Sequence, residues 1–199
     1  MKTTKKIIFS LLTIAIVLTS FHIYQVHFNY RFKEIAEGKV FQSGVIPPHE
    51  IKDYITKYNI KTIIDLRLGS VIDPLNPSLN EDIIKEHNAV SAIKGVRHVN
   101  LPSKQIPNKE NLEQFFNILD NDNSYPVLIH CYHGIGRAGL YSALYRIKYE
   151  GLSNEEARKK TKFITFLSSF DHGTSKGEWL KNYNSQEEVY KVSTITKTQ

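Results

Sequence analysis

The residues best suited to chemistry lie at positions 130–137, which read His-Cys-Tyr-His-Gly-Ile-Gly-Arg. Cys131 is the single cysteine of the chain, and Arg137 follows it after five residues. A thiolate can attack phosphorus, and a planar guanidinium can hold two oxygens of a phosphate at once. Gly134 and Gly136 allow a close backbone approach, so the N–H groups of the segment can surround an anion. The segment is therefore predicted to bind a phosphate group above a nucleophilic sulfur.

The flanking sequence predicts how this segment is held. The apolar run Tyr125–Ile129 is typical of a buried strand, and the run Leu140–Ile147 has the apolar stripe of a helix. The segment should then lie at a helix N-terminus, where backbone N–H groups are unpaired and the helix dipole is positive. This environment, with a nearby cation, favours the thiolate form of Cys131. His130 and His133 flank the cysteine, and we expect them to shape the loop rather than to bind zinc.

The composition limits the partners. The chain has 199 residues and a formal net charge of +6, which favours phosphorylated molecules, anionic lipid surfaces or nucleic acid. No nucleic-acid-binding motif accompanies the charge, so we expect no nucleic-acid partner. A single cysteine excludes an internal disulfide framework and a cysteine-rich metal site, and the eight histidines show no metal-ligand spacing.

Residues 1–28 form a distinct N-terminal segment. Three lysines at positions 2, 5 and 6 precede Ile7–Tyr24, an uncharged and mostly apolar stretch about long enough to span a bilayer. No A-x-A-like cleavage site follows, so we expect a retained membrane anchor. The alternatives are a cleaved signal peptide, which would make the protein secreted, and a buried core helix. Lysines before the span predict a cytoplasmic N-terminus, which would place the remaining chain on the outer side, periplasmic or extracellular.

The remaining sequence is divided into a linker at 29–38, one domain at 39–190 and a polar tail at 191–199. Within the domain, strand-like and helix-like patterns alternate. The predicted strands lie at 39–44, 61–67, 96–101 and 125–129, and the predicted helices at 47–58, 80–89, 108–119 and 140–147. Ser153 and Glu156 predict a capping box that begins a further helix. The alternation predicts an α/β fold with a central, mainly parallel sheet flanked by helices and with ligands at the carboxyl ends of its strands.

The motif His-Cys-x5-Arg between a strand and a helix resembles that of the cysteine-dependent tyrosine and dual-specificity phosphatases. Weaker landmarks follow in the order found in small bacterial dual-specificity-like phosphatases, over about residues 38–183: Val40–Gly44, Ile60–Arg67, Val99–Pro102 and Pro126–Leu144. The resemblance implies a dual-specificity phosphatase-like fold and a reaction without a metal or another cofactor. Cys131 would attack phosphorus to form a phosphocysteine, which water would hydrolyse, while Arg137 stabilises the phosphate oxygens. The substrate-binding residues would be His130, which also supports the loop, Tyr132, His133, Gly134, Ile135, Gly136 and Ala138.

One position of the loop departs from the family pattern. The family has Ser or Thr directly after the arginine, where this chain has Ala138. That hydroxyl stabilises the thiolate as it leaves in the second step. A lost hydrogen bond to a charged group costs about 1.5–3 kcal/mol, or roughly ten- to a hundred-fold in rate. We therefore expect slow turnover.

The general acid also departs from the pattern. The family supplies an aspartate upstream of the cysteine, but no carboxylate occurs here between Glu86 and Glu110. Asp65 lies on a predicted strand and is expected to be structural, capping the following turn. Asp171 lies in a predicted loop and is the candidate general acid. The carboxylates considered for this role are Asp65, Asp73, Glu110 and Asp171.

The sequence thus predicts a membrane-anchored, metal-independent phosphomonoesterase. Its substrate is left open between phosphotyrosine in proteins, phosphoinositides or inositol phosphates, and phospholipid headgroups. The alternative is a pseudophosphatase that binds phosphorylated partners without turnover, which Ala138 and the missing acid favour. A sulfur-transfer or redox protein is a weaker rival, because the chain has no resolving cysteine. His98 and His172 are expected to be ordinary surface residues.

Overall fold

A five-stranded sheet forms the centre of the domain in the computed structural model, which describes residues 2–70, 76–162, 169 and 171–184. The strand order is β1-β2-β5-β3-β4. All neighbouring pairs are parallel except β1 and β2, so the predicted mainly parallel sheet is confirmed. The strands are β1 (Lys33–Ala36), β2 (Val40–Ser43), β3 (Thr62–Asp65), β4 (Arg97–Asn100) and β5 (Val127–His130).

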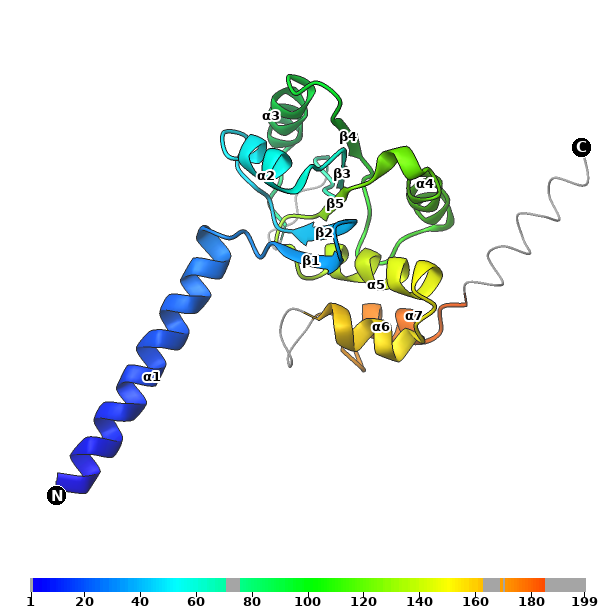
Figure 1. The fold of residues 1–199 in the computed structure, drawn as a ribbon. Helices are drawn as coiled ribbons and strands as arrows, with labels where there is room; N and C mark the ends of the chain where they lie inside the picture. The colour runs from blue at the N-terminus through cyan, green and yellow to red at the C-terminus, as the bar shows by residue number, and fades with distance from the viewer. Residues whose placement is uncertain (1, 71–75, 163–168, 170, 185–199) are drawn as a thin grey trace, which may run out of the picture.

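Helices cover both faces of the sheet (Figure 1). One core cluster joins Ile63 and Leu128 of the sheet to α2 and α3, and the other joins Ile64 and Ile129 to α4 and α5. Successive strand residues point to opposite faces, so each central strand contributes to both cores. The helices of the domain are α2 (Ile51–Tyr58), α3 (Asn80–Ser91), α4 (Lys109–Leu119), α5 (Arg137–Tyr149), α6 (Asn154–Thr161) and α7 (Ser175–Lys181), with a 3-10 turn, η1 (Asp122–Ser124).

The sheet register brings three strand ends to the same level. Ser43 at the end of β2 and Asp65 at the end of β3 both pair with His130 at the end of β5. The segment that follows His130 therefore starts at the centre of the carboxyl edge of the sheet. This is the position at which ligands bind in open α/β sheets.

The predicted linker at 29–38 differs from the structure, because β1 (Lys33–Ala36) lies within it and pairs antiparallel with β2. Ile35 is the one fully buried residue of this edge strand. Lys33 and Glu34 give the strand a polar sequence, as is common at sheet edges. Apolar periodicity alone therefore does not reveal it.

The helix α1 (Lys2–His27) projects away from the domain (Figure 1). Its stretch Thr4–His27 contains an 18-residue window with a mean hydropathy of 2.1, and none of that window is buried. Its length and composition suit a membrane span or a signal sequence. The predicted tail at 191–199 lies outside the described residues.

Local signals account for the starts of two helices. The Oδ1 of Asn108 accepts a hydrogen bond of 2.8 Å from the backbone N–H of Asn111 and caps α4. The predicted capping box of Ser153 and Glu156 is confirmed at the start of α6.

The cap of α4 gives a test of the fold. Asn108→Ala removes the acceptor and is expected to lower the free energy of unfolding by about 1 kcal/mol. Urea denaturation of the full chain in detergent micelles measures this. Asn117→Ala is the matched control, because Asn117 is exposed inside the same helix, where alanine is the better helix former. Equal losses in the two variants would contradict the assigned cap.

Candidate active site

Cys131 lies at the end of β5, directly before the loop that leads into α5. Its side chain is 2% exposed. The backbone N–H of Gly134 donates to Cys131 Sγ at 3.3 Å. A backbone donor aimed at the sulfur stabilises negative charge on it. The cysteine therefore sits at the base of the loop with its sulfur turned towards the loop amides.

Gly134 allows the loop to pack closely against the end of β2. Its φ is +74°, and a Cβ at this position would lie 2.3 Å from the backbone nitrogen of Gly44. Gln42, which is fully buried on β2, donates from Nε2 to the Gly134 carbonyl at 2.7 Å. A side chain at residue 134 would therefore push the loop away from the sheet.

Arg137 is the first residue of α5 and is 3% exposed. Its guanidinium donates to the carbonyls of Leu66 at 2.7 Å and Ser103 at 3.2 Å, and to Asn76 Oδ1 at 3.0 Å. It thus joins the segments that follow β3 and β4 to the cysteine loop. A guanidinium has five N–H donors, so these contacts leave capacity to bind an oxyanion.

Two further cations lie close to the loop, and the sequence interpretation missed both. Lys176 of α7 is 7% exposed, and a Cβ on Gly136 would lie 3.0 Å from its Nζ. Burial and the charge of Arg137 lower the pKa of Lys176, whereas the Cys131 thiolate opposes this shift. Arg31 donates to the His133 carbonyl at 2.7 Å, and burial lowers its pKa while Cys131 again acts in the opposite direction. No local pattern marks either residue, since each is distant from the motif in sequence.

The other predicted site residues of the loop differ in how deeply they are buried. The rings of Tyr132 and His133 are half-buried and meet edge-to-face at 4.8 Å between their centroids. Ile135 and Gly136 are half-buried, and Ala138 is fully buried in the first turn of α5. The structure therefore brings the loop residues, Arg137 and the two additional cations together.

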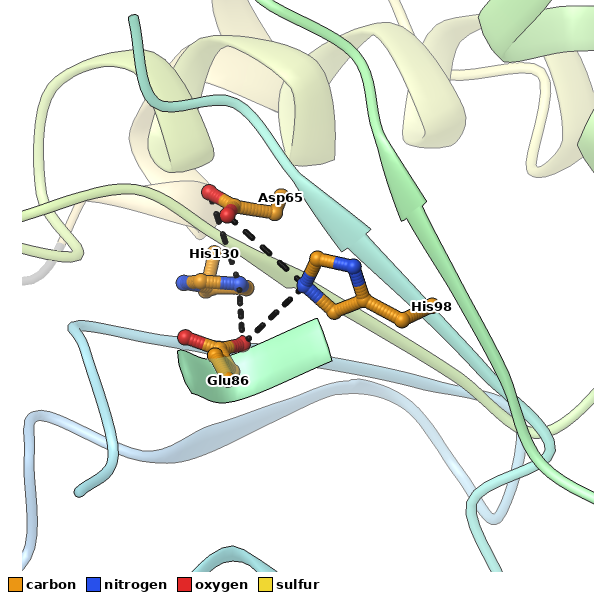
Figure 2. Close-up of side chains that lie close together, drawn as sticks. All are labelled: Asp65, Glu86, His98 and His130. Carbon is orange, nitrogen blue, oxygen red and sulfur yellow. Dashed lines mark ion pairs between the residues drawn. The ribbon is translucent and has the colours of Figure 1, made fainter. Parts of the chain in front are cut away.

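His130 points away from this site, into a buried cluster of charged groups. Its Nε2 lies 3.0 Å from Glu86 Oε1 and 3.6 Å from Asp65 Oδ1 (Figure 2). Arg67 pairs with both carboxylates, at 2.8 Å to Asp65 and 2.7 Å to Glu86. Burial lowers the pKa of His130, but Glu86 and Asp65 outweigh it, and the net shift is upward. His130, the residue before the cysteine, is thus held by the carboxylates of Asp65 and Glu86 on the side away from the loop.

The expectation that His98 is a surface residue is wrong, because its side chain is 1% exposed and belongs to the same cluster. Its Nε2 lies 3.4 Å from Glu86 Oε1 and 3.7 Å from Asp65 Oδ2. The physical reason is that a parallel sheet is covered on both faces, so a polar residue on either face of β4 can be buried. His172, by contrast, is exposed and pairs with Glu155 at 3.1 Å, as expected.

The carboxylates considered as general acids lie in different environments. Asp171 pairs with Arg158 at 3.1 Å and with Lys162, and two cations favour its ionised form. Asp65 is buried and accepts from the backbone N–H of Arg67 at 3.0 Å, which fits its expected structural role. Glu110 is exposed in the first turn of α4, and Asp73 lies outside the described residues.

Comparisons with known proteins agree on one kind of fold. The family model described as a DSP-PTPase phosphatase fused to NAD+ kinase matches residues 22–178. TpbA of P. aeruginosa is 15% identical with a TM-score of 0.57, covering 83% of this chain and 92% of its own. The core catalytic domain of the PP-IP phosphatase SIW14 from S. cerevisiae is 16% identical with a TM-score of 0.57, covering 84% and 94%. PTPMT1, solved in complex with PI(5)P, is 17% identical with a TM-score of 0.56, covering 83% and 98%. No curated protein matches the chain.

The close approach of Gly134 to β2 can be tested against a glycine of similar backbone conformation. Gly95 has a φ of +83°, but its Cβ position has nothing within 4 Å. Gly95→Ala should therefore cost only backbone strain, about 1–2 kcal/mol. Gly134→Ala should cost a further 1–3 kcal/mol, roughly, from the steric overlap. Urea denaturation of the full chain in micelles compares the two, and an equal loss would show that residue 134 does not lie against Gly44.

Proposed function

The chain belongs to the family of DSP-PTPase phosphatases described as fused to NAD+ kinase, and from this premise we propose that it hydrolyses phosphate monoesters through a phosphocysteine on Cys131. The observation that carries the proposal is the sulfur of Cys131 at the base of a loop whose Gly134 N–H points at it. Arg137 begins the helix on the other side of that loop. A nucleophile and a bidentate phosphate ligand therefore flank the same short segment.

The reaction we propose has two steps. Cys131 Sγ attacks phosphorus, the bond from phosphorus to the ester oxygen breaks, and the leaving oxygen takes up a proton. Water then attacks phosphorus, the sulfur–phosphorus bond breaks, and phosphate and the thiolate are released. Arg137 and the loop N–H groups stabilise the charge on the phosphate oxygens in both transition states.

Lys176 adds to this stabilisation in our proposal. Its ammonium group lies against Gly136 and interacts electrostatically with both Cys131 and Arg137. It is buried, so its charge acts through a medium of lower dielectric constant than water. A phosphate dianion above Cys131 would therefore meet two buried cations.

The substrate class that we favour depends on how readily the leaving oxygen can receive a proton. Asp171 stays a prediction as the general acid, and its pairs with Arg158 and Lys162 favour the carboxylate over the proton-donating form. Without an efficient acid, a phenolic leaving group with a pKa of about 10 reacts more readily than an alkyl alcohol. We therefore propose phosphotyrosine-type esters as the preferred substrates, with phosphoinositide or phospholipid headgroups as the alternative. A cysteine-to-serine variant of TpbA has been solved with pTyr and PTPMT1 with PI(5)P, so each of the two compounds has been seen bound to a protein of this fold.

We further propose that α1 anchors the enzyme in a membrane, with the domain on the outer side. The apolar stretch Thr4–His27 supports the anchor, and the lysines that precede it support the orientation. This location keeps lipid headgroups within reach of the site.

A pseudophosphatase is the second candidate function, and Ala138 is the observation that favours it. The residue is fully buried directly after Arg137, where it offers a methyl group in place of the hydroxyl that the family pattern leads us to expect. The loss affects release of the thiolate rather than capture of phosphate. Binding without turnover would be the extreme result of that loss.

The nucleophile is tested with the full chain in detergent micelles on an aryl phosphate, a phosphotyrosine peptide and a phosphoinositide. We expect kcat/KM to fall in that order, because the leaving groups become poorer. Cys131→Ser should lower turnover of all three by at least about a thousand-fold. Absence of turnover by the unaltered chain, with retained binding of vanadate or phosphopeptide, would favour the pseudophosphatase.

The role of Lys176 is tested by Lys176→Met, which removes the charge and keeps most of the side-chain length. We expect kcat/KM on the aryl phosphate to fall roughly ten- to a hundred-fold, as for the loss of a hydrogen bond to a charged group. Lys181→Met is the matched control, since Lys181 is on the same helix and exposed. Similar kinetics of the two variants would rule Lys176 out of the site.

A further inference from the structure

Four side chains behind the cysteine loop place metal-ligating atoms around one small space. Asp65 ends β3, His98 lies on β4, His130 ends β5 and Glu86 comes from α3 (Figure 2). We call these four residues the histidine–carboxylate cluster. One ligand atom from each lies within 4.8 Å of the others, and all four side chains are buried.

Four nitrogen–oxygen distances within the cluster are close to the edge length of a tetrahedral site. Glu86 Oε1 lies 3.0 Å from His130 Nε2 and 3.4 Å from His98 Nε2. Asp65 Oδ1 lies 3.6 Å from the former nitrogen, and the other carboxylate oxygen of Asp65, Oδ2, lies 3.7 Å from the latter. A tetrahedral zinc ion with bonds of about 2.0–2.1 Å requires ligand atoms roughly 3.3 Å apart. The four measured distances lie on either side of this value.

The hydrogen bonding of the cluster gives a second, independent observation. Both ring nitrogens of His98 and of His130, and Oε1 of Glu86, are buried without a hydrogen bond among the described residues. The histidine nitrogens are therefore close to Glu86 Oε1 without an N–H group that points at this oxygen in hydrogen-bond geometry. Buried polar atoms without partners are costly, and a cation would satisfy three of these atoms, namely His98 Nε2, His130 Nε2 and Glu86 Oε1.

We propose that the histidine–carboxylate cluster binds a borderline divalent cation of the zinc type, through His98 Nε2, His130 Nε2, Glu86 Oε1 and one oxygen of Asp65. Imidazole nitrogens with carboxylate oxygens form a ligand set that such ions favour. The cluster needs additional positive charge, since two carboxylates outnumber the single guanidinium of Arg67. A proton on a histidine or a bound cation supplies it, so the two compete.

Arg67 has a defined place in this arrangement. It donates to Glu86 Oε2, which is not the oxygen assigned to the ion, and to Asp65 through Nε and Nη2. It thus fixes the orientation of both carboxylates, as outer partners of metal ligands commonly do.

The ion would lie outside the phosphatase chemistry. Neighbouring strand residues point to opposite faces, and the side chain of His130 lies on the α3 face while that of Cys131 belongs to the core on the α5 face. The two residues share a peptide bond. A cation at the cluster would therefore anchor the end of β5 beneath the loop and support its position without touching the substrate.

The test uses the full chain carrying Cys131→Ser, in detergent micelles, so that no thiolate can bind the metal. After treatment with a chelator and dialysis, Zn²⁺ is titrated calorimetrically. We expect one saturable site and a rise in the melting temperature on zinc addition. His98→Gln in the same background should weaken zinc affinity at least about a hundred-fold, because a direct ligand is lost. His172→Gln is the matched control and should leave the affinity unchanged, since His172 is exposed.

Two results would overturn the proposal: no saturable zinc binding by the Cys131→Ser chain, or equal affinity in the His98→Gln and His172→Gln variants. The cluster would then be an ion-pair network that holds a proton. If His98→Gln fails to fold, Co²⁺ added to the Cys131→Ser chain decides instead. The intense visible absorption of tetrahedral Co²⁺ would support the site, and the weak absorption of hexahydrated Co²⁺ would exclude it. Phosphatase activity enters neither readout, so this proposal and the proposed function can fail separately.

Discussion

The buried guanidinium of Arg137 is the interaction on which the candidate site depends. A cation removed from water requires compensation, and this one is surrounded by the carbonyls of Leu66 and Ser103 and by Asn76. Those acceptors belong to segments after β3 and β4, so the charge holds together the edge of the sheet at which the cysteine loop begins. In the reaction proposed for this site, the same cation binds the phosphate oxygens, so one residue would link the stability of the sheet edge to oxyanion binding.

The two adjacent residues at the end of β5, His130 and Cys131, face two different environments. On one side Cys131 accepts a hydrogen bond from the Gly134 N–H and lies near the cations Lys176 and Arg31. On the other side His130 meets two carboxylates and Arg67, an arrangement that favours positive charge. The alternation of strand side chains separates the two by the thickness of the sheet.

The sequence revealed what local patterns encode. The buried strands β3 and β5, the Asn108 cap and the Ser153 capping box all follow from short segments, and each is present in the structure. The motif of Cys131 and Arg137 also lies within one segment. Features that depend on distant segments were missed: β1 because it is polar, Lys176 because α7 folds back onto the loop, and His98 because its burial depends on α3. The cluster shows no metal-ligand spacing in sequence for the same reason, since its members come from four separate elements.

In the proposed reaction, Cys131 forms a covalent phosphoryl intermediate whose breakdown is slow. Rapid mixing of the full chain with a chromogenic aryl phosphate, acid quenching and mass spectrometry of the peptides test it most directly. We expect a burst of released phenol equal to the enzyme concentration, together with a phosphoryl group on the peptide that contains Cys131. Steady hydrolysis without a burst and without a modified cysteine peptide would contradict it.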